Sequence, residues 1–251
     1  MKRNLLLAAV LMTAGSILAA DSKDEISAAA KKLAASDNYS WSSTTENANA
    51  NAGGGGGGRR GGGRGGFGGP VSGKTEKGGY TMVTFGTGDN AMQGVIKGEK
   101  GALETQDGWQ SIAELTADNG GGGFNRGMFA ARRLQNLKTP AAEVEAMLAN
   151  VKEISKSDDA YSGELSEEGA KALMTFGRGR GGNGNGPEIS DAKATVKFWL
   201  KDGTLSKFET HMTGSISFNG NERKIDNTTK VEIKDVGSTK IQVPEEARKK
   251  M

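Results

Sequence analysis

The amino-acid sequence predicts an α+β fold in which helices cover one face of an antiparallel β-sheet. Three observations support this prediction. Apolar and polar residues alternate along the C-terminal part of the chain, turn-forming pairs separate the alternating runs, and amphipathic segments with helical spacing precede them.

The alternation is clearest from residue 194 onward. One parity of the first run contains the apolar residues Ala194, Val196, Phe198 and Leu200, and one parity of the second contains Phe208, Met212, Ile216 and Phe218. Beyond a further turn, the apolar residues are Ile225, Val231, Ile233 and, past Gly237, Ile241 and Val243. The turns are Asp202-Gly203 and Asn219-Gly220, pairs that favour tight hairpins. The pattern predicts an antiparallel meander with one covered face and one solvated face.

Further strands are expected nearer the N-terminus. Strand-like runs occupy residues 38–41, 80–85, 91–96 and 102–115, the last around Trp109. Turn signals such as Asp107-Gly108 separate them.

Three helices are expected. Ser22 and Glu25 have the spacing of a capping box at the start of a helix over 23–35. Thr139 and Pro140 are typical of the start of a second helix, whose apolar stripe is Val144, Met147, Leu148, Val151 and Ile154. A third helix is expected to begin at Ser166 and continue through Met174.

Glycine is concentrated in three segments. The longest, residues 48–79, is rich in glycine and arginine, and it has too little apolar surface to offset the entropy cost of ordering. We therefore expect a disordered insertion over 48–79, within a single domain spanning 21–251. Shorter glycine islands at 120–123 and 177–186 are expected to be loops.

The first twenty residues have the pattern of a cleavable signal peptide. Lys2 and Arg3 precede an apolar run that ends in Ala19 and Ala20. We expect cleavage near Ala20 and export to the periplasm or the extracellular space. No later run is as long as the roughly 20 apolar residues that span a bilayer, so no transmembrane segment is expected in the mature chain.

Charge and cysteine content exclude several function classes. Removal of residues 1–20 leaves 33 − 2 = 31 basic residues against 30 acidic ones, so net basicity gives no support for a nucleic-acid partner. The chain has no cysteine, which excludes disulfides, thiolate metal sites and cysteine nucleophiles. The arginine-glycine tract resembles RNA-binding repeats. Because the protein is expected to be exported, we interpret the tract as a solvated spacer or as a segment weakly attracted to anionic lipid or polysaccharide.

The remaining motifs do not favour catalysis. Gly68 to Thr75 match the letters of a phosphate-binding loop, but a glycine tract precedes them and a strand-like run follows. His211 is the single histidine and falls on the polar parity, so we expect it to be exposed and structural. We expect Trp41, Trp109 and Trp199 to be partly buried in the sheet. No catalytic residue, metal or cofactor is expected, and the chain is not expected to be an enzyme.

Two segments resemble exported envelope proteins of the LolA/LppX-like lipoprotein-carrier superfamily. They read VKFWLKDG at 196–203 and VEIKDVGSTKIQVPEEA at 231–247, and the order of elements is similar too. The resemblance implies a strongly curved antiparallel sheet, a half-barrel, whose hollow is closed by helices and holds acyl chains. It places toward that hollow Val196, Phe198, Leu200, Phe208, Met212 and Ile216. The glycine-arginine insertion departs from the pattern. The arginine with which some carriers latch their lid has no counterpart that we can assign in this sequence, although Arg132 and Arg133 lie near an expected helix.

These observations favour an exported, non-enzymatic protein that holds an apolar ligand between sheet and helices. The expected ligand is a lipid or a lipoprotein acyl chain, with peripheral contact to the envelope. The alternative is an envelope scaffold with a closed core, in which the glycine loops act as spacers or adhesive elements.

Overall fold

A single antiparallel β-sheet of eleven strands organises the chain. The computed structural model describes residues 14–48, 69–117, 126–175, 188–218 and 221–251. Within these ranges the strand order is β6-β5-β4-β3-β2-β1-β11-β10-β9-β8-β7, which is an open sheet. The predicted α+β class is confirmed.

The centre of the sheet consists of long strands. They are β1 (Asn38–Asn47), β9 (Glu188–Lys201), β10 (Thr204–Phe218) and β11 (Asn221–Lys234). Asp202 and Gly203 both have positive φ, as a primed two-residue turn between twisted strands requires, so the predicted hairpin between β9 and β10 is confirmed. The pairing of Phe208 with Phe198 and Val231 places the predicted apolar parity on one face.

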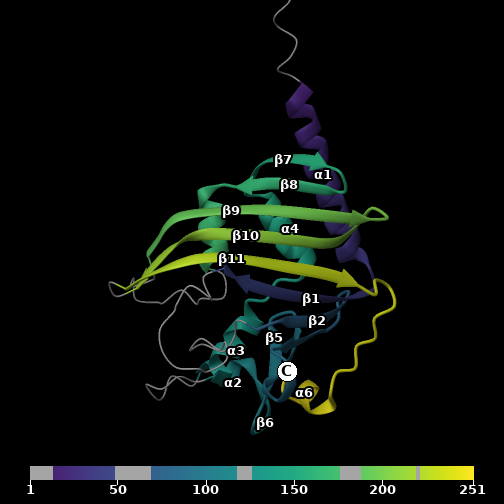
Figure 1. Cartoon of the computed structure of the whole chain (residues 1–251). Coiled ribbons are helices and arrows are strands. Elements are labelled where there is room, and N and C mark those ends of the chain that lie inside the picture. The colour runs from purple at the N-terminus through teal and green to yellow at the C-terminus, as the bar shows by residue number, and fades with distance from the viewer. Residues whose placement is uncertain (1–13, 49–68, 118–125, 176–187, 219–220) are drawn as a thin grey trace, which may run out of the picture.

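Shorter strands form the two wings of the sheet. One wing comprises β2 (Val71–Glu76), β3 (Thr81–Phe85), β4 (Met92–Lys97), β5 (Lys100–Thr105) and β6 (Gly108–Ser111), with a 3₁₀ turn at Gly88–Asn90. The other comprises β7 (Val151–Ser157) and β8 (Ala160–Leu165). The sheet twists so strongly that β5 runs steeply across the direction of β9–β11 (Figure 1).

Two groups of helices pack on one face of the sheet, which we call the inner face. α1 (Ala14–Ala35), α4 (Pro140–Leu148) and α5 (Glu167–Thr175) lie over the wing with β7–β10, while α2 (Ile112–Ala117) and α3 (Arg126–Gln135) lie over β4–β6 (Figure 1). Lys23 Nζ donates to the Val151 carbonyl at 3.0 Å and Ser27 Oγ donates to Glu145 at 2.9 Å, which fixes α1 against β7 and α4. Within the described ranges, no helix combines the length and apolarity needed to cross a membrane.

The apolar core is divided between the two faces. The main cluster lies between the sheet and helices α1–α5 and includes Leu33, Leu134, Val144, Phe198 and Phe208. A smaller cluster lies on the opposite, outer face, where α6 (Glu245–Lys249) covers Val95, Ala102 and Trp109. The chain therefore uses both faces of one wing for burial.

Two helix predictions are confirmed at their starts. Thr139 Oγ1 accepts from the Ala142 backbone N–H, and Ser166 Oγ accepts from the Gly169 N–H at 3.1 Å. The predicted stripe of the second helix was wrong beyond Leu148, because Val151 and Ile154 belong to strand β7. Asn150 ends the helix: its side-chain amide donates to the Ala146 carbonyl, and its own carbonyl accepts from Ser166.

The first helix begins earlier than predicted. α1 starts at Ala14 rather than near residue 23, so Ser22 lies inside the helix and does not cap it. No glycine or proline occurs between residues 16 and 35, so the helix runs without a break from the end of the leader into the segment after residue 23. Residues 1–13 lie outside the described residues.

Three boundaries also differ. The predicted insertion over 48–79 ends too late, because residues 71–76 form β2; residues 49–68 and the two shorter glycine islands lie outside the described residues. The strand-like run 102–115 becomes β5, β6 and then α2, because Ser111 and Glu114 form a capping box with bonds of 3.1 and 3.0 Å. Ile241 and Val243 do not continue the meander but pack on the outer face with α6.

Candidate functional site: the inner face of the sheet

The six apolar residues predicted to face a ligand lie together on the inner face. Val196, Phe198 and Phe208 are at most 1% exposed, and Ile216 is 5% exposed. Leu200 and Met212 are partly buried against the same cluster. The register joins the set across β9 and β10, where Phe208 pairs with Phe198. Their role as ligand contacts stays a prediction, and in this structure the deepest of them contact the chain's own core.

The inner surface of β1 and β2 differs from that of β9 and β10. The Trp41 indole N–H donates to Thr75 Oγ1 at 3.2 Å, and Gly73, directly opposite Trp41, leaves space for the indole. Burial raises the pKa of the neighbouring Tyr39 hydroxyl, while hydrogen bonds to Thr139 and Thr75 lower it. The inner face of β1 and β2 is therefore aromatic and hydrogen-bonded rather than purely aliphatic.

The described part of the phosphate-loop match, residues 69–75, does not form a phosphate-binding loop. Lys74 and Thr75 are consecutive residues of strand β2, and Lys74 Nζ donates to the Lys240 carbonyl at 3.4 Å. A phosphate loop requires backbone N–H groups that converge at the start of a helix, whereas these N–H groups belong to a paired strand.

Two charged side chains are partly withdrawn from water near the link between α3 and α4. The Arg133 guanidinium lies 5.1 Å from the centre of the Phe85 ring, and burial holds its pKa below the usual value. Burial also raises the pKa of Glu143 to about 7, while the charge of Lys138 lowers it. Glu143 is therefore the described carboxyl group whose ionisation the fold opposes most strongly.

A cluster of uncharged polar residues interrupts the apolar inner face. We call it the polar patch, and it comprises Ser43, Thr45 and Asn47 of β1, Thr210 of β10, and Asn227 and Thr229 of β11. Their parity is that of Trp41, Phe208 and Val231, which lie in the main core. The sequence carried a signal for this patch, because the apolar parity of the third run passes from Ile225 to Val231 across Asn227 and Thr229.

The other candidate residues do not form a site. His211 is exposed on the outer face, and its Nε2 lies 2.9 Å from Asp226 Oδ1, as expected for a structural role. Trp41 and Trp109 are buried in different clusters, and Trp199 lies under Lys207 at 3.9 Å from its ring centre. Among the described residues, no three His, Asp or Glu side chains gather where they could hold a metal ion.

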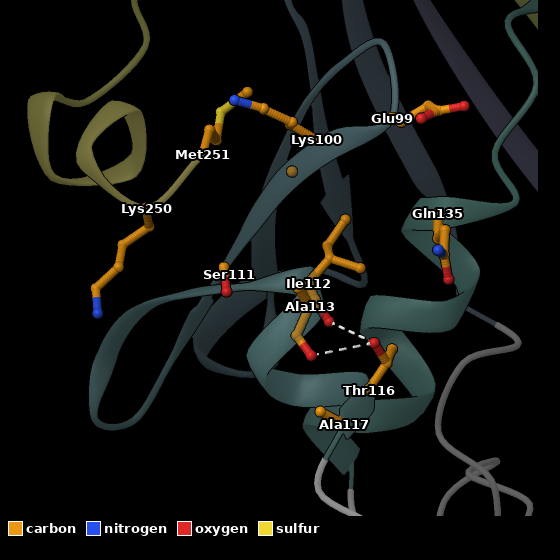
Figure 2. Close-up of a pocket in the computed structure, with 11 residues that line it drawn as sticks. Glu99, Lys100, Ser111, Ile112, Ala113, Thr116, Ala117, Gln135, Lys250 and Met251 are labelled. Carbon is orange, nitrogen blue, oxygen red and sulfur yellow. Dashed lines mark hydrogen bonds between the residues drawn. The ribbon is translucent and has the colours of Figure 1, made fainter.

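A separate open pocket of about 390 Å³ lies at the wing of the sheet formed by β2–β6 (Figure 2). Its walls come from the β4–β5 turn, α2, the end of α3 and the C-terminus, and Figure 2 shows Thr116 turned back to bond the carbonyl groups of Ile112 and Ala113. None of the six predicted ligand-facing residues lines this pocket.

Comparison with known proteins gives matches among solved structures. No family model matches the chain, and no curated protein matches it. LprF from Mycobacterium bovis is 11% identical, covers 91% of this chain and 98% of its own, and has a TM-score of 0.44. The Mycobacterium tuberculosis lipoprotein LppX is 10% identical, with coverage of 90% and 99% and a TM-score of 0.44. Both matches extend over at least 90% of this chain at 10–11% identity.

Proposed function

We propose that this chain is an exported, non-enzymatic binding protein that holds an apolar ligand on the inner face of its sheet. The observation that carries the proposal is the uneven cover of that face. Phe198 and Phe208 are closed off by the helices, yet Thr45, which points to the same side, is exposed. The described helix groups lie over opposite wings of the sheet (Figure 1). Between them Trp41, Val71 and Val231 are still buried, and the face becomes more open only toward the end of β1, at Thr45 and Asn47.

An acyl chain entering over β1 and β11 would first meet Met212 and then the aliphatic residues beside it. Each CH₂ transferred from water to such a surface contributes about 0.8 kcal/mol. Contact with Val196 and Phe208 requires α1 and α5 to separate from β9 and β10, because these helices cover both strands. A lipid or a lipoprotein acyl chain meets the apolar requirement.

The second candidate is an envelope scaffold with a closed core. The complete burial of Val196, Phe198 and Phe208 by the chain's own residues favours it. In that case the inner face contributes only to stability, and no ligand separates the helices from the sheet.

Binding of a fluorescent fatty acid tests the proposal. We expect uptake by the wild type and about tenfold weaker uptake by Met212→Asn, because the substitution replaces an apolar contact with a group that must be desolvated. Thr195→Asn is the matched control, since Thr195 lies on the neighbouring strand and faces outward. Absence of uptake by the folded wild type, or equal loss in both variants, would support the scaffold instead.

A further inference from the structure

The polar patch is positioned by strand register within the inner face. Thr229 pairs with Thr45 on one side and Thr210 on the other, while Asn227 pairs with Asn47 and Met212. On the next strand, β9, Val196 pairs with Thr210 and Ala194 pairs with Met212. The patch therefore borders apolar residues directly. The head-group end of an acyl chain that lies along Met212 would therefore be close to these polar groups.

The patch contains a buried acceptor without a donor. Thr45 Oγ1 and Thr229 Oγ1 lie 2.9 Å apart and bond each other. Asn227 Oδ1 is shielded from water, and within the described residues it has no hydrogen-bond partner. Buried carbonyl oxygens are rarely left in this state, so Asn227 Oδ1 is an acceptor that an external N–H or O–H would satisfy once the groups that shield it move aside.

The charge of the patch restricts what it can accept. From Ile225 to Ile233 of β11, and in the stretches of β1 and β10 paired with it, the inner-facing residues carry no charge. The nearest inner-parity charge on β11 is Arg223, which is exposed toward the start of the strand and pairs with Ile216. An anionic group at Asn227 would face a carbonyl oxygen and hydroxyl groups, and no positively charged side chain lies on the inner face of this stretch to balance its charge.

From these observations we infer that the polar patch binds the uncharged, hydrogen-bond-donating head group of an amphiphile, with hydroxyl or amide N–H groups, whose acyl chain lies along Met212 and Val196. This inference rests on the proposed apolar-ligand function and specifies its ligand class. Asn227 Oδ1 accepts from the head group, and the threonine hydroxyls of the patch donate to it or accept from it.

Competition between three oleoyl amphiphiles tests the inference. Oleic acid, monoolein and oleoyl lysophosphatidate are compared as competitors of a bound fluorescent fatty acid at equal acyl-chain length. We expect the wild type to prefer monoolein over the other two by about tenfold, the size of effect that a buried hydrogen bond gives. Asn227→Leu, which is close in volume and cannot accept, is expected to lose this preference while it retains oleic acid.

The control is Thr228→Val, which changes the next residue of β11 on the outer face and is expected to leave all three affinities unchanged. A wild type that takes up all three probes equally, one that prefers lysophosphatidate, or an Asn227→Leu variant that keeps the monoolein preference would overturn the inference and leave the proposed function standing. Failure of the folded wild type to take up any probe would overturn both.

Discussion

Single residues on the central strands explain why the sheet accepts aromatic side chains at its middle. The Trp41 indole lies over the backbone of Gly73, and its N–H is satisfied by Thr75. A glycine inside a strand usually weakens it, but here it provides the space that the indole occupies. The letters that resemble a phosphate-binding loop thus have a packing explanation in Gly73 and a hydrogen-bonding one in Thr75.

Gly73→Ala should therefore destabilise the fold. A methyl group at this position would overlap the indole of Trp41, which is 6% exposed and has little space to move. We expect a loss of about 1–3 kcal/mol in the free energy of unfolding, measured by chemical denaturation. Ser72→Ala, the neighbouring residue on the outer side of β2, should change it by less than about 0.5 kcal/mol. Equal stability of the two variants would contradict this packing.

Glu143 should make stability depend on pH in the opposite sense to an ordinary ion-paired carboxylate. Its pKa is raised from 4.5 to about 7 by burial, so between these values the folded state binds the proton more tightly than the unfolded state. Stability should then fall as pH rises from 4.5 to 7 and level off above that. Glu143→Gln should remove this dependence, a difference of up to about 3 kcal/mol between pH 4 and pH 8. Parallel pH–stability curves for the two proteins would show that Glu143 ionises normally.

At the scale of helices and strands, the sequence predicted an element correctly where a single hydrophobic period, of a helix or of a strand, continued through the whole segment. The alternation of β9 and the Asp202-Gly203 turn predicted a hairpin that is present. Val151 and Ile154 were assigned to a helix because they continue its spacing, although Asn150 stops that helix through its own hydrogen bonds. The polar patch was missed although its signal was present: the apolar residues Ile225 and Val231 were used to define the face, and the polar residues Asn227 and Thr229 between them at the same parity were passed over.

The position of the C-terminal helix, α6, could not be predicted from hydrophobic periodicity alone. Val243 and Ala247 follow the meander in sequence, but they pack on the outer face against Val95, Ala102 and Trp109. Which face a short segment covers depends on tertiary contacts with distant strands, and those contacts leave no periodic signal in five residues. α6 therefore covers an apolar area on the outer face of this wing.

Ala247→Glu should disrupt this second cluster. Ala247 is fully buried, so the variant must either bury a charge or detach α6 from the sheet. We expect a loss of about 2–4 kcal/mol by thermal or chemical denaturation. Glu246→Ala, at an exposed position of the same helix, should be close to neutral. If Ala247→Glu were equally neutral, α6 would contribute nothing to the stability of the fold.

For the whole molecule, the architecture is compatible with export. The predicted cleavage site near Ala20 lies within α1, and from residue 22 onward, where the side chains of this helix are described, its buried apolar residues are Ile26, Ala29, Ala30 and Leu33. Removal of residues 1–20 would leave these four side chains in the chain. The overall class was predictable because alternation and turn pairs define a sheet with one apolar face, whereas the division of the helices between two wings depends on contacts far apart in sequence.

Export itself is tested by the N-terminus of the protein recovered from its host. We expect intact mass and N-terminal sequencing to show a chain that begins at or near Asp21. A recombinant chain starting at Asp21 should melt at the same temperature as the full-length chain, because Ile26, Ala30 and Leu33 are retained. Recovery of the uncleaved chain beginning at Met1 would contradict the predicted leader.

The central claim, that the inner face holds an apolar ligand, is tested most directly by native mass spectrometry of the protein purified gently from its host envelope. We expect a bound amphiphile with an uncharged head group, detected by its mass and released by organic extraction. A homogeneous ligand-free mass, with no adduct formed when the folded protein is incubated with monoolein or oleic acid, would contradict it and favour the closed-core scaffold.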